Sequence, residues 1–266
     1  MENSGNMSFL QHLEELRWRL VRCAIVIVLL AIVIWYFQEE IMVNLFLSMK
    51  DKDFVTFRLL CQYIGVCVEE IPVKMQSMTV SGQFTYALMM SFLGGLVISF
   101  PYVFYQIWSF IKPGLKQREK KMVNGLVFYV SLLFFLGILF GYFIVAPLSV
   151  QFFGSYQISN QIENNFTIGS YMSTIFSTVF YSGLFFLLPV VSYLLTKIGL
   201  INVSFLIKYR KHAIVAILIL AAIITPPDIA SQIIVSIPII ILYEIGILVS
   251  KRAERLAKKE AQSIQE

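Results

Sequence analysis

Charged residues are scarce in this 266-residue chain, since Asp, Glu, Lys and Arg together make up only 14% of it. Soluble domains usually carry about 25% charged residues. Hydrophobic residues make up 58% of the chain and aromatic residues 15%. This composition excludes a water-soluble fold and predicts an all-α polytopic membrane protein that forms a single membrane domain over residues 1–266.

Residues that usually carry catalysis are also rare. The chain has two His and three Cys, and its polar regions contain no phosphate-binding glycine loop, metal-ligand cluster or Ser/His/Asp arrangement. An enzyme, a nucleotide site, a metal site and a cofactor are therefore not expected. The formal net charge of +5 would by itself suit nucleic acid or an anionic surface. The positively charged residues lie beside apolar stretches, which indicates that they face the surface of a lipid bilayer and not nucleic acid.

Five long apolar stretches and one short stretch are predicted to cross the bilayer as six transmembrane helices. The criterion is about 20 apolar residues per crossing. The fifth stretch has only about a dozen residues, roughly 18 Å of helix against a hydrocarbon core of roughly 30 Å, so the final hairpin is short and is predicted to thin the bilayer locally. The predicted spans are residues 21–37, 86–111, 123–147, 172–196, 213–224 and 233–249.

Positive charge predicts the orientation of these spans. Of the 21 Lys and Arg, 17 lie before or at the start of the first span, in the second and fourth connections or in the tail, while four lie in the first connection. By the positive-inside rule both termini are cytoplasmic. Residues 1–20 are then a cytoplasmic amphipathic segment, residues 38–84 the first extracytoplasmic loop and residues 251–266 a cytoplasmic tail. Cys61 and Cys67 fall in that loop, where oxidising conditions permit a disulfide that their spacing does not require.

Four short motifs follow one another along the chain. They are HLEELRWRL at residues 12–20, PYVFYQIWSFIKPGLKQREK at residues 101–120, TPPD at residues 225–228 and YEIG at residues 243–246. The first resembles the H-L-x-E-L-R-x-R-L opening of the TatC family, the multispanning receptor subunit of the twin-arginine protein translocase, and the second is similar to that family's P-x-x-x-Y-Q-x-W-x-F-x-x-P-x-L-x-x-x-E-[RK] signature. The other two motifs follow in the family's order. The resemblance leaves out mainly the first extracytoplasmic loop, the third connection and the tails.

The resemblance implies a subunit that receives twin-arginine signal peptides and exports folded proteins across the bacterial cytoplasmic (inner) membrane, energised by the proton motive force. It also implies single-span TatA/TatB-type helices as partners, and further copies of the chain in a homo-oligomeric complex. A proton-coupled small-molecule transporter is the alternative, although the two halves of the chain show none of the similarity common in such transporters. A polytopic membrane enzyme is a further competing class.

Acidic residues facing the cytoplasm are the expected receptor groups, because a guanidinium donates two parallel hydrogen bonds to a carboxylate. Glu15 and Glu119 match the family at such positions. For Glu15 the alternative is an i, i+4 pair with Arg19, which contributes only about 0.2 to 0.5 kcal/mol. Arg17 and Phe110 match family residues near the signal-peptide site, and the alternatives for them are a topological arginine and an interfacial aromatic ring.

Glu244 is the acidic residue clearly inside an apolar span, which predicts an intramembrane polar contact or a contact with a partner helix. Its alternative is to reach the interface near Lys251 by snorkelling. At Leu187 the family commonly has Glu or Gln, so the intramembrane polar patch is reduced in this chain. The remaining predicted structural residues bend or bound spans, or close and cap the final hairpin; they are Pro101, Pro189, Pro226, Pro227 and Asp228.

Overall fold

The computed structural model describes residues 9–65, 67, 74–111, 125–159, 161, 164–197, 199–225 and 229–262. Within these residues, five helical stretches are long and apolar enough to cross a membrane: His12–Tyr36, Gly82–Ile111, Leu126–Ser155, Ile168–Lys197 and Gln232–Arg252. The chain is therefore a multi-pass helical membrane protein. Contacts divide it into two compact units, one of residues 1–43 and 79–131 and the other of residues 44–78 and 132–266.

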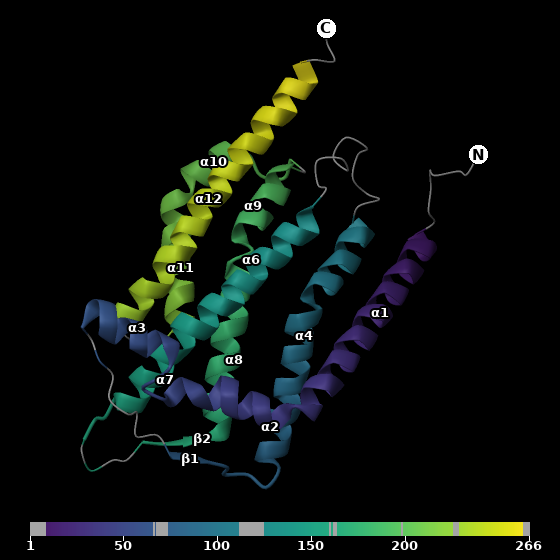
Figure 1. Cartoon of the computed structure of the whole chain (residues 1–266). Coiled ribbons are helices and arrows are strands. Elements are labelled where there is room, and N and C mark those ends of the chain that lie inside the picture. The colour runs from purple at the N-terminus through teal and green to yellow at the C-terminus, as the bar shows by residue number, and fades with distance from the viewer. Residues whose placement is uncertain are drawn as a thin grey trace. The chain divides into compact units, whose positions relative to one another are not determined.

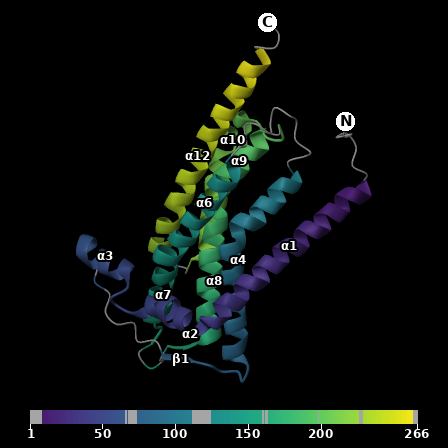
Figure 2. The same cartoon turned by 45° about the vertical axis from the view of Figure 1, so that its right-hand side comes forward.

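The first unit is built on two long helices, α1 (Phe9–Tyr36) and α4 (Gly82–Ile111), which run antiparallel (Figures 1 and 2). The short α2 (Gln38–Ile41) follows α1. Residues 9–20 continue directly into the first span as one helix. Pro101 lies inside α4, which continues to Ile111. The predicted amphipathic segment is therefore an extension of the spanning helix.

Gly95 allows α1 and α4 to approach closely. A Cβ atom at this position would lie 2.8 Å from the carbonyl oxygen of Ile27 and 2.9 Å from the backbone nitrogen of Ala31. In lipid, helices associate through close packing of this kind, because the hydrophobic effect does not drive them together. At Gly94 the nearest atom is the tip of the Ile34 side chain, which can rotate away. The two adjacent glycines therefore differ in what a side chain would meet.

The second unit contains most of α6 (Leu126–Phe140) and the elements that follow it. These are a π-helical turn at Gly141–Val145, α7 (Ala146–Ser155), α8 (Ile168–Phe185), α9 (Leu188–Lys197), α10 (Val203–Lys208), α11 (Arg210–Ile224) and α12 (Ile229–Gln262). α12 packs along α9 and α11, and α8 packs against the π-helical turn. A buried apolar cluster joins that turn to α11 and α12; its members are Val145, Ile217, Ala221, Val235 and Ile239.

The fourth predicted span is interrupted near Pro189. Helix α8 ends at Phe185, and α9 begins at Leu188. Pro189 has no N–H to donate to the carbonyl of Phe185 four residues earlier, and proline is tolerated in the first turn of the next helix. The span predicted as one helix over residues 172–196 is therefore two helices with a turn between them.

The fifth predicted span lies in α11, which has 15 residues. This helix is about 22 Å long, well short of a hydrocarbon core of about 30 Å. The length of α11 agrees with the short fifth span that was predicted, whereas the last candidate span, Gln232–Arg252, has 21 residues. The count of six spans stays a prediction. The turn residues Pro226, Pro227 and Asp228 lie outside the described part of the chain.

Two short strands depart from the all-α prediction. β1 (Lys74–Gln76) pairs in parallel with β2 (Asn165–Thr167), with Lys74 opposite Asn165 and Gln76 opposite Thr167. Strands of three residues are too short to show an alternating pattern, so the sequence did not reveal them. The pairing joins the segment before α4 to the segment before α8.

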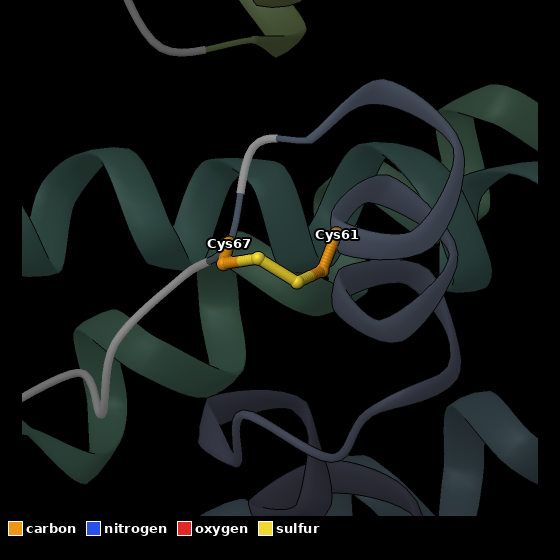
Figure 3. Close-up of a disulfide and its surroundings, with 2 residues drawn as sticks. All are labelled: Cys61 and Cys67. Atoms are coloured by element: carbon orange, nitrogen blue, oxygen red, sulfur yellow. A yellow bond between two sulfur atoms is a disulfide. The ribbon is translucent and has the colours of Figure 1, made fainter.

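The predicted first extracytoplasmic loop contains ordered helix. A 3₁₀ turn at Leu47–Lys50 is followed by α3 (Val55–Ile64). Gly65 ends α3 with φ +76°, the left-handed conformation common after a helix C-terminus. A disulfide then joins Cys61 to Cys67, whose Cα atoms lie 4.2 Å apart (Figure 3). Cys23, in the first span, is buried and free.

Candidate functional site

A polar network joins the N-terminal part of α1 to the C-terminal part of α4. Arg19 donates from Nε and Nη2 to Oε1 of Glu15, over 2.9 and 2.6 Å. Its Nη1 donates to Oε1 of Gln106 over 3.1 Å. Nε2 of Gln106 then donates to the hydroxyl of Tyr102 over 2.8 Å. The network thus runs from a partly exposed carboxylate to a buried amide.

Helical spacing explains why these four side chains meet. Glu15 and Arg19 are four residues apart on α1, and Tyr102 and Gln106 are four residues apart on α4, so each pair shares one face of its helix. The Glu15 side chain is 26% exposed, and the Gln106 residue is 6% exposed. Within the described residues, Oε2 of Glu15 accepts no hydrogen bond.

An aromatic stack lies at the same end of this helix pair. The imidazole of His12 stacks on the ring of Phe110, with centroids 4.2 Å apart and planes 15° apart. Both side chains are half-buried. Phe110 lies one turn beyond Gln106 on α4, so the stack continues the face that carries the polar network. The sequence argument missed His12, Tyr102 and Gln106, although the spacing 102, 106, 110 was a usable signal.

The four residues predicted to contact a signal peptide lie in different surroundings, and one of them is outside the described residues. Glu15 and Phe110 lie in the polar network and the aromatic stack just described. Arg17 is exposed, and its guanidinium lies 5.8 Å from the ring centroid of the neighbouring Trp18. Glu119 falls in residues 112–124, which lie outside the described residues. The i, i+4 alternative for Glu15 is present, because its described partner is Arg19.

Glu244 pairs across the final hairpin. Nη2 of Arg210 on α11 donates to Oε2 of Glu244 on α12 over 2.9 Å, and both side chains are partly exposed. Next to it, the Tyr243 hydroxyl donates to the carbonyl of Leu206 over 2.9 Å, which ties α12 to α10. The described partner of this acid is thus Arg210 and not Lys251. Leu187 lies in the turn between α8 and α9.

These features define a class: a multi-pass helical membrane protein with a partly exposed carboxylate that already holds a guanidinium at one end of a helix pair. In the described part of the chain, no group of three His, Cys, Asp or Glu could hold a metal ion. Residues 11–238 match the model of the Sec-independent protein translocase protein (TatC), and the chain belongs to this family. The resemblance inferred from the four motifs is confirmed.

Individual relatives are similar in sequence to this chain along nearly its whole length. The TatC protein of Blattabacterium sp. subsp. Periplaneta americana (strain BPLAN) is 38% identical over 260 residues, which cover 94% of this chain and 97% of that protein. TatCy of Bacillus subtilis (strain 168) is 32% identical over 259 residues, covering 97% and 94%. A crystal structure of the twin-arginine translocase receptor TatC has a TM-score of 0.68 and 30% identity, and the match covers 91% of this chain and 99% of that one.

Proposed function

We propose that this chain is the signal-peptide receptor and a core subunit of a translocase that exports folded proteins, and that Glu15 binds one arginine of a twin-arginine signal peptide. The observation that carries the proposal is the two-donor contact of Arg19 with Glu15. A carboxylate that accepts two bonds from an internal guanidinium has the geometry to accept them from an incoming one. Family membership supports the same role.

Arg19 then acts as the ligand's internal competitor. When a signal-peptide arginine takes Oε1 of Glu15, Arg19 keeps its contact with Oε1 of Gln106, 3.1 Å away. Gln106 is itself held by Tyr102. An arginine that leaves Glu15 in this way does not lose every acceptor, so the exchange costs less than exposing an unpaired buried charge.

Charge balance calls for a second acid. Glu15 is already neutralised by Arg19, and two further guanidinium groups would leave the site with an excess of positive charge. Glu119 is the proposed second carboxylate, because it matches the acidic position of the family motif. The exposed Arg17 is proposed to contact the peptide backbone or its acidic groups, and Phe110 its apolar side chains.

The proposed setting is the bacterial cytoplasmic (inner) membrane, with six spans and both termini in the cytoplasm. Of the 21 Lys and Arg, 17 lie in segments on the proposed cytoplasmic side, which supports this orientation by the positive-inside rule. Single-span TatA/TatB-type helices and further copies of the chain are the proposed partners, and the proton motive force is the proposed energy source. The transporter alternative is not favoured, since the acid on which it depends, Glu244, pairs with Arg210.

Glu119→Gln is expected to leave the protein inserted and to lower crosslinking of a twin-arginine precursor by about tenfold, because one charge-assisted hydrogen bond is worth about 1.5 to 3 kcal/mol. The measurement is photocrosslinking from a site-specific probe on the precursor, next to its arginine pair. A precursor with two lysines in place of the arginines is the control for background contact. Wild-type crosslinking by the variant would remove Glu119 from the binding site.

Lengthening the final hairpin tests the thinning of the bilayer. Four apolar residues inserted after Ile219 add about 6 Å to α11 and turn the helix by about 400°, so the buried face of the helix is nearly preserved. Insertion is expected to leave the membrane-inserted amount unchanged and to reduce export of a folded reporter several-fold. The control is the same insertion after Arg252, beyond the last candidate span. Equal export by both variants would discard thinning as part of the mechanism.

A further inference from the structure

Helix α3 is held against the third candidate span by a specific polar contact. Pro147 has no N–H, so it cannot donate the i, i+4 hydrogen bond to the carbonyl of Phe143. The hydroxyl of Thr56 on α3 donates to that carbonyl. Non-helical donors of this kind satisfy backbone groups that proline frees at membrane depth. The contact fixes the position of α3 along the span.

Aromatic packing supports the same position. The ring of Phe54, which immediately precedes α3, stacks on the ring of Phe143 with centroids 6.1 Å apart. It also meets the Tyr142 ring edge-on at 5.9 Å. Phe57 of α3 is only 1% exposed. Helix α3 and the residue before it therefore pack on their own unit through Phe54 and Phe57.

The position of Phe143 places α3 at the boundary of the bilayer. The candidate span runs from Leu126 to Ser155. At 1.5 Å per residue, Phe143 lies about 26 Å from Leu126 and about 18 Å from Ser155. A hydrocarbon core of about 30 Å that begins near Leu126 spans about 20 residues and ends near Ala146. With that starting point Phe143 lies about 4 Å inside the edge of the core, which puts α3 near the level where acyl chains meet headgroups.

The other side of α3 carries an exposed apolar stripe. Val55, Leu59 and Tyr63 follow one another at intervals of four residues and are 48%, 49% and 77% exposed. Such spacing places the three side chains along one line of the helix. Arg58 and Gln62 are exposed beside this stripe, so the free surface of α3 has an apolar strip next to a polar one. This is the pattern of a helix that lies in a membrane interface.

The stripe adjoins a surface that already faces lipid. Helix α6 and the π-helical turn expose an apolar row that leads up to the anchoring point of α3: Leu132, Leu136, Leu139 and Phe143. Such a row on a membrane-spanning helix meets acyl chains. An apolar stripe beside the end of this row is continuous with the lipid-facing surface of the span.

We propose that α3 is an interfacial helix whose stripe of Val55, Leu59 and Tyr63 inserts among the acyl chains of the adjacent leaflet. Arg58 and Gln62 then lie at the level of the headgroups. The Thr56 hydroxyl attaches the N-terminal end of α3 to the span, and the Cys61–Cys67 disulfide ties the chain that leaves α3 back to its last turn. This role goes beyond the proposed receptor function. On the proposed topology the adjacent leaflet is the extracytoplasmic one.

Nitroxide accessibility tests the proposal. The variants carry Cys23→Ser, which removes the free thiol, together with Val55→Cys, Leu59→Cys or Gln62→Cys, and retain the native disulfide. Each is spin-labelled and reconstituted in vesicles of phosphatidylcholine and phosphatidylglycerol. Power saturation then compares collisions with oxygen, which concentrates in acyl chains, and with a water-soluble nickel chelate.

Labels at positions 55 and 59 are expected to have oxygen-to-nickel collision ratios several times that of the label at position 62. Equal ratios at the three positions, or a higher ratio at position 62, would overturn the proposal. Strong nickel collisions at positions 55 and 59 would instead leave the stripe in water and available to a protein partner. Two stripe positions guard against a local disturbance at either one. Mass spectrometry confirms that the native disulfide is intact in each labelled variant.

Discussion

Glu15→Gln is expected to lower the affinity for a twin-arginine signal peptide by at least about tenfold. Glutamine keeps the size of the side chain and removes its charge, so the incoming guanidinium loses a charge-assisted contact worth about 1.5 to 3 kcal/mol, and tenfold corresponds to about 1.4 kcal/mol. The variant also releases Arg19 from its carboxylate, which adds an unpaired positive charge to the site. Fluorescence anisotropy of a labelled peptide with the purified protein measures the change.

Glu14→Gln is the matched control. It makes the same charge change one residue away, on an exposed side chain that lies on a different face of α1. Peptide affinity within twofold of the original protein is expected for this control. Equal losses for the two variants would mean that general surface charge, and not the Glu15 carboxylate, attracts the peptide.

Gly95→Ala is expected to destabilise the α1–α4 pair and, with it, peptide binding. The added Cβ would lie 2.8 Å from the Ile27 carbonyl oxygen and 2.9 Å from the Ala31 nitrogen, so the two backbones must separate. Overpacking of this kind costs about 1 to 3 kcal/mol. Because the pair also brings Glu15 and Gln106 together, the separation weakens the polar network. Thermal unfolding in detergent, together with peptide anisotropy, measures both effects.

Gly94→Ala separates the clash from the change in helix propensity. Both substitutions gain about 1 kcal/mol of propensity, but at position 94 the new Cβ meets only the end of the Ile34 side chain. The melting temperature of Gly94→Ala is expected to stay near that of the original protein or to rise. If Gly95→Ala behaved in the same way, the close approach of the two backbones would not matter for stability.

The sequence predicted the features that depend on composition and local spacing. Apolar length predicted the five long apolar helical stretches and the shortness of α11, since lipid requires about 20 apolar residues per crossing. The motif at residues 12–20 indicated Glu15 as a receptor residue, and the i, i+4 rule gave its pair with Arg19 as the alternative, which the structure contains. Both inferences need only neighbours along one helix.

Features that depend on distant partners were not predicted. The contact of Arg19 with Gln106 and the pair of Arg210 with Glu244 each join two helices, and no single-helix pattern carries that information. The division of the fourth span had a local signal in Pro189, yet proline inside membrane helices is often accommodated without a break. Helix α3 was read as part of a loop, because ten residues are too few for a crossing.

The small parallel sheet has a consequence for the order in which the protein is assembled. β1 precedes α4, whereas its partner β2 leaves the ribosome only after α4, α6 and α7 have been synthesised. The backbone groups of β1 must therefore wait, bonded to water or to other donors, until the later segment arrives. The sheet therefore forms late in biogenesis, and a nascent chain that stops before Asn165 cannot form it.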